Sequence, residues 1–104
     1  MAIFDNRPEI EEEASTFEEL KEPPKYKVLL HNDDYTTMEF VVKVLMTVFH
    51  KTKVEAVKIM LNVHRNGIGV CGVYPAEIAE TKVTLVHNMA KREGFPLRCS
   101  MEEV

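Results

Sequence analysis

The fold is decided by residues 26–42, which read YKVLLHNDDYTTMEFVV. The first five residues are mostly apolar and follow Pro23-Pro24, which stops any preceding helix, so they predict a strand over Tyr26–Leu30. The polar cluster His31–Asp34 ends this strand. Apolar residues then recur at helical spacing from Met38 onward. A strand therefore leads through a short polar loop into a helix.

Two helices are predicted between this loop and residue 67. Thr36 and Glu39 have the spacing of a capping box, so the first helix is expected to run from about Thr37 to Phe49. The same signature recurs at residues 52–55 and begins a second helix, which Asn66-Gly67 ends with a left-handed turn.

The rest of the chain predicts a strand, a helix and a strand. Ile68–Tyr74 is short and rich in β-branched residues, Pro75 opens a third helix, and Lys91–Gly94 ends it. Leu97–Met101 forms the last strand. The order β-α-α-β-α-β favours an α+β fold, in which three helices pack on one face of a three-stranded sheet, over a doubly wound sheet.

Length and charge predict one small domain that follows an N-terminal arm. The chain has 104 residues, and residues 1–24 carry eight acidic residues against two basic ones. The same stretch has few apolar residues and no sustained period, so we expect a flexible acidic arm, with a transient helix over residues 10–20 as an alternative. Residues 25–104 carry nine acidic and eleven basic residues and enough apolar ones for a single core, so the domain is assigned to them.

The composition argues against several classes of protein. Apolar runs are shorter than the roughly 18 residues of a membrane span, and the start of the chain lacks a secretory signal, so we expect a cytoplasmic protein without membrane contact. Neither part is basic enough to indicate nucleic-acid binding. Cys71 and Cys99 lie too far apart for a metal clip and are expected to be buried, and the four histidines lack metal-binding spacing. No cofactor or metal is therefore expected.

The loop His31-Asn32-Asp33-Asp34-Tyr35-Thr36 offers many hydrogen-bond acceptors but no lysine or arginine. Such a cluster suits a cation with several N–H donors, of which an ammonium group is the simplest, because each carboxylate accepts at two oxygens. The more common role of such a cluster is structural. In that case Asn32 and Asp33 form an Asx turn and Asp34 favours the helix N-terminus.

His64 lies on the same predicted helix face as Met60. A buried imidazole without a partner costs about 1–3 kcal/mol, so we expect a partner, and the Asn-Asp loop is a candidate. A histidine on an apolar helix face is nevertheless more often structural than ligand-binding. Met38 and Met60 lie near the two polar elements, and methionine suits a pocket that accepts several side-chain shapes, although it more often fills a core.

Five segments carry a resemblance to a known family. In chain order they are YKVLL (26–30), NDDYT and MEFV (32–36 and 38–41), ML and VH (60–61 and 63–64), CGVY (71–74) and AEIAETKV (76–83). This order resembles the ClpS family, whose members are bacterial adaptors that bring N-end rule substrates to the ClpA unfoldase of the ClpAP protease. The resemblance covers about residues 23–103.

The resemblance implies a monomeric adaptor without enzymatic activity. The residues that it implies for binding the free α-amino group of a substrate, in part through water, are Asn32, Asp33 and His64. The residues implied for the pocket that takes a first side chain of Leu, Phe, Tyr or Trp are Leu30, Thr36, Met38, Val41, Met60, Val63 and Leu97. Met38 would act as a gatekeeper that disfavours β-branched first residues. The residues implied for docking on the N-terminal domain of ClpA are Glu77, Glu80 and Lys82.

Two positions depart from the family pattern. Many relatives have proline where this chain has Thr37, and if Thr37 is the first helical residue the loss of proline costs some pre-organisation. His31 is also atypical. Two other classes remain as alternatives: a small hydrolase that uses Asp33 and His64 as an acid–base pair, and an interaction module of the ribosomal-stalk kind, which has a similar order of elements.

Overall fold

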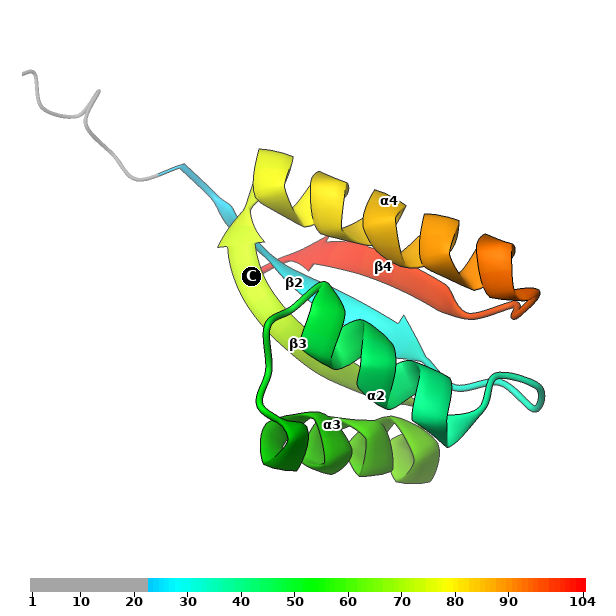
Figure 1. Ribbon diagram of the computed structural model, residues 1–104. Helices are drawn as coiled ribbons and strands as arrows, with labels where there is room; N and C mark the ends of the chain where they lie inside the picture. Colours follow the sequence, from blue (N-terminus) through cyan, green and yellow to red (C-terminus); the bar gives the residue numbers. More distant parts are fainter. Residues whose placement is uncertain (1–22) are drawn as a thin grey trace, which may run out of the picture.

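The computed structural model describes residues 23–104 and shows the predicted α+β fold (Figure 1). The elements in chain order are β2 (Lys25–His31), α2 (Met38–Thr47), α3 (Lys53–Asn66), β3 (Ile68–Pro75), α4 (Ala76–Glu93) and β4 (Arg98–Glu103). The order β-α-α-β-α-β is confirmed. The prediction of an acidic arm falls almost entirely on residues 1–22, which lie outside the described part, and it stays a prediction.

The three strands form one antiparallel sheet in the order β3-β2-β4. The central strand β2 pairs with β3 from Lys25↔Pro75 to His31↔Ile68, with a register shift between Val28 and Leu29. Because the end of β2 is paired on both sides, the loop that follows it leaves the sheet from a fixed position.

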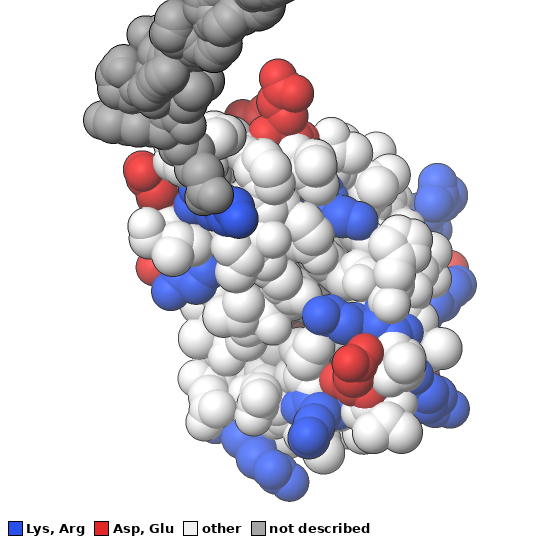
Figure 2. Space-filling view, turned by 90° about the vertical axis from the view of Figure 1, so that its left-hand side faces the viewer, with Lys and Arg blue, Asp and Glu red and all other residues white. Residues whose placement is uncertain are grey.

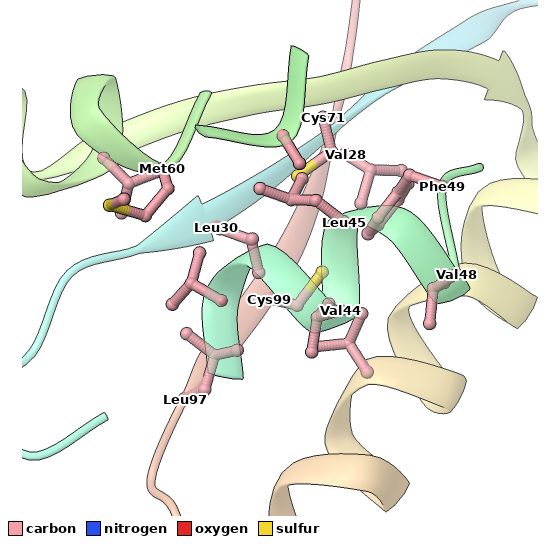
Figure 3. Packing of buried hydrophobic residues seen from close by; sticks show 14 of the residues in the cluster. Val28, Leu30, Val44, Leu45, Val48, Phe49, Met60, Cys71, Leu97 and Cys99 are labelled. Carbon is pink, nitrogen blue, oxygen red and sulfur yellow. The ribbon is translucent and has the colours of Figure 1, made fainter. Parts of the chain in front are cut away.

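All three helices lie on one side of the sheet (Figure 1). α4 packs on all three strands, while α3 packs on β3 and on α2. The side chains of Val28 and Leu30 point from β2 into the core and are fully buried, together with Val44 and Leu45 from α2 (Figure 3). No helix of residues 23–104 is long and apolar enough to cross a membrane.

The two cysteines are buried free thiols, as predicted. Both side chains lie inside the apolar cluster, Cys71 from β3 and Cys99 from β4 (Figure 3). Burial raises the pKa of the Cys71 thiol far above its usual range and that of the Cys99 thiol to about 12. Neither thiol is therefore an activated nucleophile at neutral pH.

The cap of α2 differs from the prediction. Thr37, not Thr36, is the N-cap residue, since its hydroxyl accepts a hydrogen bond from the Phe40 N–H at 3.1 Å. The Thr36 hydroxyl instead donates to the carboxylate of Asp33 at 2.7 Å. Thr37 is therefore the capping residue and not the first helical residue, so the loss of pre-organisation expected at the first helical position does not apply.

The capping box of α3 is confirmed at Thr52 and Glu55. Gly67 ends this helix with φ at +87°, a left-handed conformation that favours glycine, and the chain turns directly into β3. Gly94 ends α4 in the same way, with φ at +80°.

Gly69 lets α3 approach β3 closely. A Cβ atom at this position would lie 2.7 Å from a methyl group of the Val63 side chain. Val63 is itself buried, so it has little room to move away.

We expect Gly69→Ala to lower the free energy of unfolding by about 1–3 kcal/mol, the usual cost of overpacking. Because the added methyl group meets Val63, the double variant Gly69→Ala/Val63→Ala should lose less stability than the sum of the two single variants. Urea unfolding of the four proteins measures this coupling. Additive losses would mean that the helix and the strand are not in close contact at Gly69.

Candidate functional site

A pocket of about 240 Å³ opens where β2 ends, α2 begins and α3 ends. Its lining residues are Asn32, Asp33, Asp34, Thr36, Met38, Val41, Met60, Val63 and His64. The structure thus brings together all three residues expected to bind an amino group and five of the seven expected to form the apolar pocket. Asp34, which the sequence analysis includes in the acceptor cluster and at the helix N-terminus, also lines it.

Leu30 and Leu97 do not line the pocket, contrary to expectation. Leu30 is fully buried in β2, and Leu97, just before β4, is 4% exposed. Both belong to the apolar cluster behind the pocket wall (Figure 3). Their side chains pack against the back of the pocket wall. Because protein interiors are close-packed, this contact keeps the wall residues from moving into the core.

The loop after β2 is tied to the end of α3. The Asn32 N–H donates to the carbonyl oxygen of Gly67 at 2.9 Å. This bond extends the β2–β3 pairing by one residue and places Asn32 near His64, which lies three residues before Gly67. The hydrogen bond thus brings together the Asn-Asp loop and the end of α3, which lie more than 30 residues apart in the sequence.

The carboxylate of Asp33 organises the loop. It accepts hydrogen bonds from the Tyr35 N–H at 2.8 Å and the Thr36 N–H at 2.7 Å, as well as from the Thr36 hydroxyl. Partial burial alone would raise the pKa of Asp33, but the hydrogen bonds from Thr36 and Tyr35 outweigh it and hold this pKa below its usual value. Asp33 is therefore an anion at neutral pH. Asp33 thus forms the turn that the sequence suggested, and its carboxylate also places a negative charge at the pocket.

His64 is exposed rather than buried on the apolar face of α3, which corrects the sequence prediction. The buried face of this helix consists of Ala56, Met60 and Val63. Within the described residues no hydrogen bond joins the imidazole of His64 to the loop. The cost of burying an unpaired imidazole therefore does not arise, and the ring is free to meet a ligand at the pocket mouth.

The opposite wall of the pocket is apolar. Val41, Met60 and Val63 are between 2% and 9% exposed, whereas Met38 is 46% exposed and forms the rim. The pocket thus has acceptors and negative charge at one end and buried aliphatic and thioether groups at the other. No lysine or arginine is among its lining residues.

A second hollow, which is not among the features predicted from the sequence, adjoins the pocket. This α2–α3 groove has a volume of about 490 Å³ and is lined by Met38, Glu39, Val42, Lys43, Met46, Thr47, Lys53 and Met60. Met38 and Met60 separate it from the pocket. The signal in the sequence is the spacing of Met38, Val42 and Met46, which places all three on one face of α2.

The three residues expected to dock on a partner are not equivalent. Glu77 and Glu80 are exposed on the first turns of α4. Lys82 is half-buried, and its Nζ donates to the carbonyl oxygen of Val48 at 2.7 Å. The same ammonium group lies 5.4 Å from the ring centroid of Tyr74. Lys82 therefore contributes to packing between α4 and the end of α2.

His31 does not reach the pocket. Its Nε2 lies 2.7 Å from the hydroxyl of Ser100 in β4, so the side chain bridges two strands. Burial, and to a smaller extent the charge of Arg98, lower the pKa of His31. The neutral ring is favoured, in keeping with a hydrogen bond inside the sheet.

A sequence model described as the ATP-dependent Clp protease adaptor protein ClpS matches residues 21–100. The chain belongs to the ClpS family. The ClpS adapter of Oleidesulfovibrio alaskensis is 68% identical over 87 residues, which cover 84% of each chain. That of Nitratidesulfovibrio vulgaris strain Miyazaki F is 64% identical over 87 residues, covering 84% of this chain and 87% of the relative.

A solved structure of a relative agrees with the fold. It is ClpS2 of Agrobacterium tumefaciens bound to L-phenylalaninamide, with a TM-score of 0.78 and 41% sequence identity. The match covers 80% of this chain and all of that one. The predicted resemblance to the ClpS family is thus confirmed, and this chain is an adaptor of a Clp protease.

Proposed function

We propose that this ClpS adaptor binds the free α-amino group and the large apolar first side chain of N-end rule substrates, and that it delivers them to the ClpA unfoldase of ClpAP. The observation that carries the proposal is the division of the pocket into an anionic end and an apolar end. L-phenylalaninamide, the ligand of the Agrobacterium relative, has the two matching groups, a free α-amino group and an apolar ring.

The anionic end suits an ammonium group. Asp33 and Asp34 supply negative charge, and the side chains of Asn32 and His64 lie beside them and add polar groups that can hydrogen-bond to a ligand. An α-ammonium group that leaves water must recover its hydrogen bonds from such acceptors. An N-acetylated terminus has neither the charge nor the three donors, so the pocket should discriminate against it.

The apolar end suits a large side chain. Burying a Leu or Phe side chain against Val41, Met60 and Val63 contributes roughly 1.5–3 kcal/mol. Ala or Ser as first residue would gain little. Met38 at the rim would exclude first side chains that branch at Cβ. The second branch of such a side chain lies close to the peptide backbone, where it would collide with the Met38 side chain.

A hydrolase using Asp33 and His64 is less well supported. The Asp33 carboxylate already accepts three hydrogen bonds from its own loop, and none of the described hydrogen bonds joins it to His64. A general base must lie within hydrogen-bonding reach of the group that it activates. A module of the ribosomal-stalk kind would have no need for a pocket divided in this way.

The amino-group clamp is tested with Asn32→Ala and His64→Ala. Both side chains are exposed, so the fold should persist, while Leu-initiated peptides should bind more weakly by about 1.5–3 kcal/mol, the usual value for hydrogen bonds to charged groups. Fluorescence anisotropy measures the affinity. Matched controls are Asn88→Ala and His50→Asn, which lie outside the pocket and should bind like the parent chain. Unchanged affinity in both test variants, or equal binding of N-acetylated peptides, would contradict the proposed clamp.

The role of Met38 is tested by Met38→Ala. The shorter side chain should open the rim, so that Ile- and Val-initiated peptides gain affinity relative to Leu-initiated ones. Met46→Ala is the matched control, because Met46 lies on the same helix face but lines only the α2–α3 groove. If the same anisotropy assay shows β-branched peptides still excluded from Met38→Ala, another residue sets the rim.

Docking on ClpA is assigned to the exposed acids of α4. Glu77→Lys/Glu80→Lys should weaken binding to the N-terminal domain of ClpA by about tenfold or more, which corresponds to about 1.4 kcal/mol. Peptide affinity should stay unchanged, since both residues lie outside the pocket. Glu102→Lys/Glu103→Lys, at the exposed end of β4, is the charge-matched control. Calorimetric titration that finds ClpA binding intact in the double variant would remove α4 from the docking surface.

A further inference from the structure

The α2–α3 groove is an apolar surface that the described part of the chain leaves open. Met38, Val42 and Met46 recur every four residues along the outer face of α2, and Met60 faces them from α3. Met38 is 46% and Met46 39% exposed. A row of large exposed apolar side chains in a concave surface is typical of a site that receives an apolar partner.

One end of this groove is basic. Lys53 lines it and Lys51 lies just before α3, while Lys43, which also lines the groove, already forms an ion pair with Glu93 at 3.3 Å. Glu39 is the only acidic residue among the lining. Figure 2 views the end of the molecule at which α3 begins and shows basic side chains spread over its lower part, with few acidic ones. The partner that fits this groove is therefore an apolar segment with negative charges beside it.

We propose that residues 10–17 of this chain dock in the α2–α3 groove as an amphipathic helix. Ile10, Ala14 and Phe17 have the i, i+4, i+7 spacing with which a helix lays one apolar face into a groove. In such a helix Glu13 would lie at one edge of this face, Glu11 beyond its other edge, and Glu12 on the opposite side. Residues 1–24 carry a net charge of −6 and residues 25–104 one of +2, so the two parts attract each other.

The dimensions and the connection allow this docking. Eight helical residues rise about 12 Å, and the ten residues of α2 about 15 Å. β2 begins at Lys25, which pairs with Pro75, and β3 runs back along α3 after Gly67, so Lys25 and the start of α3 lie at the same end of the domain. From Phe17 to Lys25 the chain spans up to about 26 Å, which exceeds the roughly 20 Å across two packed layers.

A weak interaction is sufficient because the segment is part of the same chain. A short tether gives an effective concentration in the millimolar range, so even a millimolar affinity leaves the groove about half occupied. A docked segment would contact Met38 and Met60, which also wall the pocket. The docked segment would thereby lie next to the rim of the pocket. This part of the proposal does not depend on which ligand the pocket binds.

The test uses the methyl resonances of the methionines in the full chain. Phe17→Ala removes the main apolar anchor and should move the resonances of Met38 and Met46, whereas Met89 and Met101, outside the groove, should stay in place. Phe4→Ala is the matched control and should change none of the four. Lys53→Glu should move the Met38 and Met46 resonances in the same direction as Phe17→Ala.

Several outcomes would overturn the proposal. Identical Met38 and Met46 resonances in the parent chain and Phe17→Ala would show that the segment does not dock. If these two resonances depend on protein concentration, a second copy occupies the groove instead. If Met46 responds to a Leu-initiated peptide but not to Phe17→Ala, the groove receives substrate. Binding of that peptide to the pocket, read from the methyl resonances of Val63, which lines only the pocket, is measured separately in each case.

Discussion

The pocket depends on one backbone hydrogen bond, from the Asn32 N–H to the carbonyl oxygen of Gly67. Antiparallel pairing between β2 and β3 ends at His31↔Ile68, and this bond continues it one step beyond the strand. It can form because Gly67 adopts a left-handed conformation that reverses α3 into β3 without an intervening loop. The polar loop and the last turns of α3 are thereby held together, although the sequence separates them widely. An ionic or apolar contact between side chains could not fix this spacing as firmly, since side chains have rotamer freedom that the paired backbone lacks.

Within the loop, the hydrogen bonds of Asp33 explain why the N-cap residue of α2 differs from the prediction. Two adjacent threonines compete for the N-cap position, and spacing to Glu39 favours Thr36. The Asp33 carboxylate takes the Thr36 hydroxyl and backbone N–H, so the helix begins one residue later and Thr37 caps it. The capping-box pattern alone could not reveal this, because the deciding hydrogen bonds go to Asp33, which lies in the turn before the helix and outside that pattern. The strands and the other two helices were predictable, since their periodicity and end signals do not compete with one another.

The candidate site was predictable only in part. A loop with many acceptors and no lysine or arginine indicated a site for a cation. The residues of the apolar wall, in contrast, were expected only from the resemblance to the ClpS family. That resemblance placed Leu30 and Leu97 at the pocket, but the structure buries both in the apolar cluster behind it, Leu30 in β2 and Leu97 just before β4. The spacing of apolar residues along the chain does not distinguish a leucine of the core from one that lines a pocket. The exposure of His64 and the internal contacts of Lys82 depend on how helices pack. Such packing is not encoded in a single helix.

The helix α2 unites the core, the pocket and the groove. Phe40, Val41, Val44 and Leu45 bury its inner face, so the domain needs this helix for stability. Its outer face carries Met38, Val42 and Met46 beside three polar residues, although a helix at the surface of a small domain normally presents mainly polar residues there. Methionines occupy that face, and their flexible thioether side chains adapt to differently shaped partners. Met38 and Met60 line both the pocket and the groove. A ligand that moves either thioether side chain in one of these surfaces would therefore reshape the other.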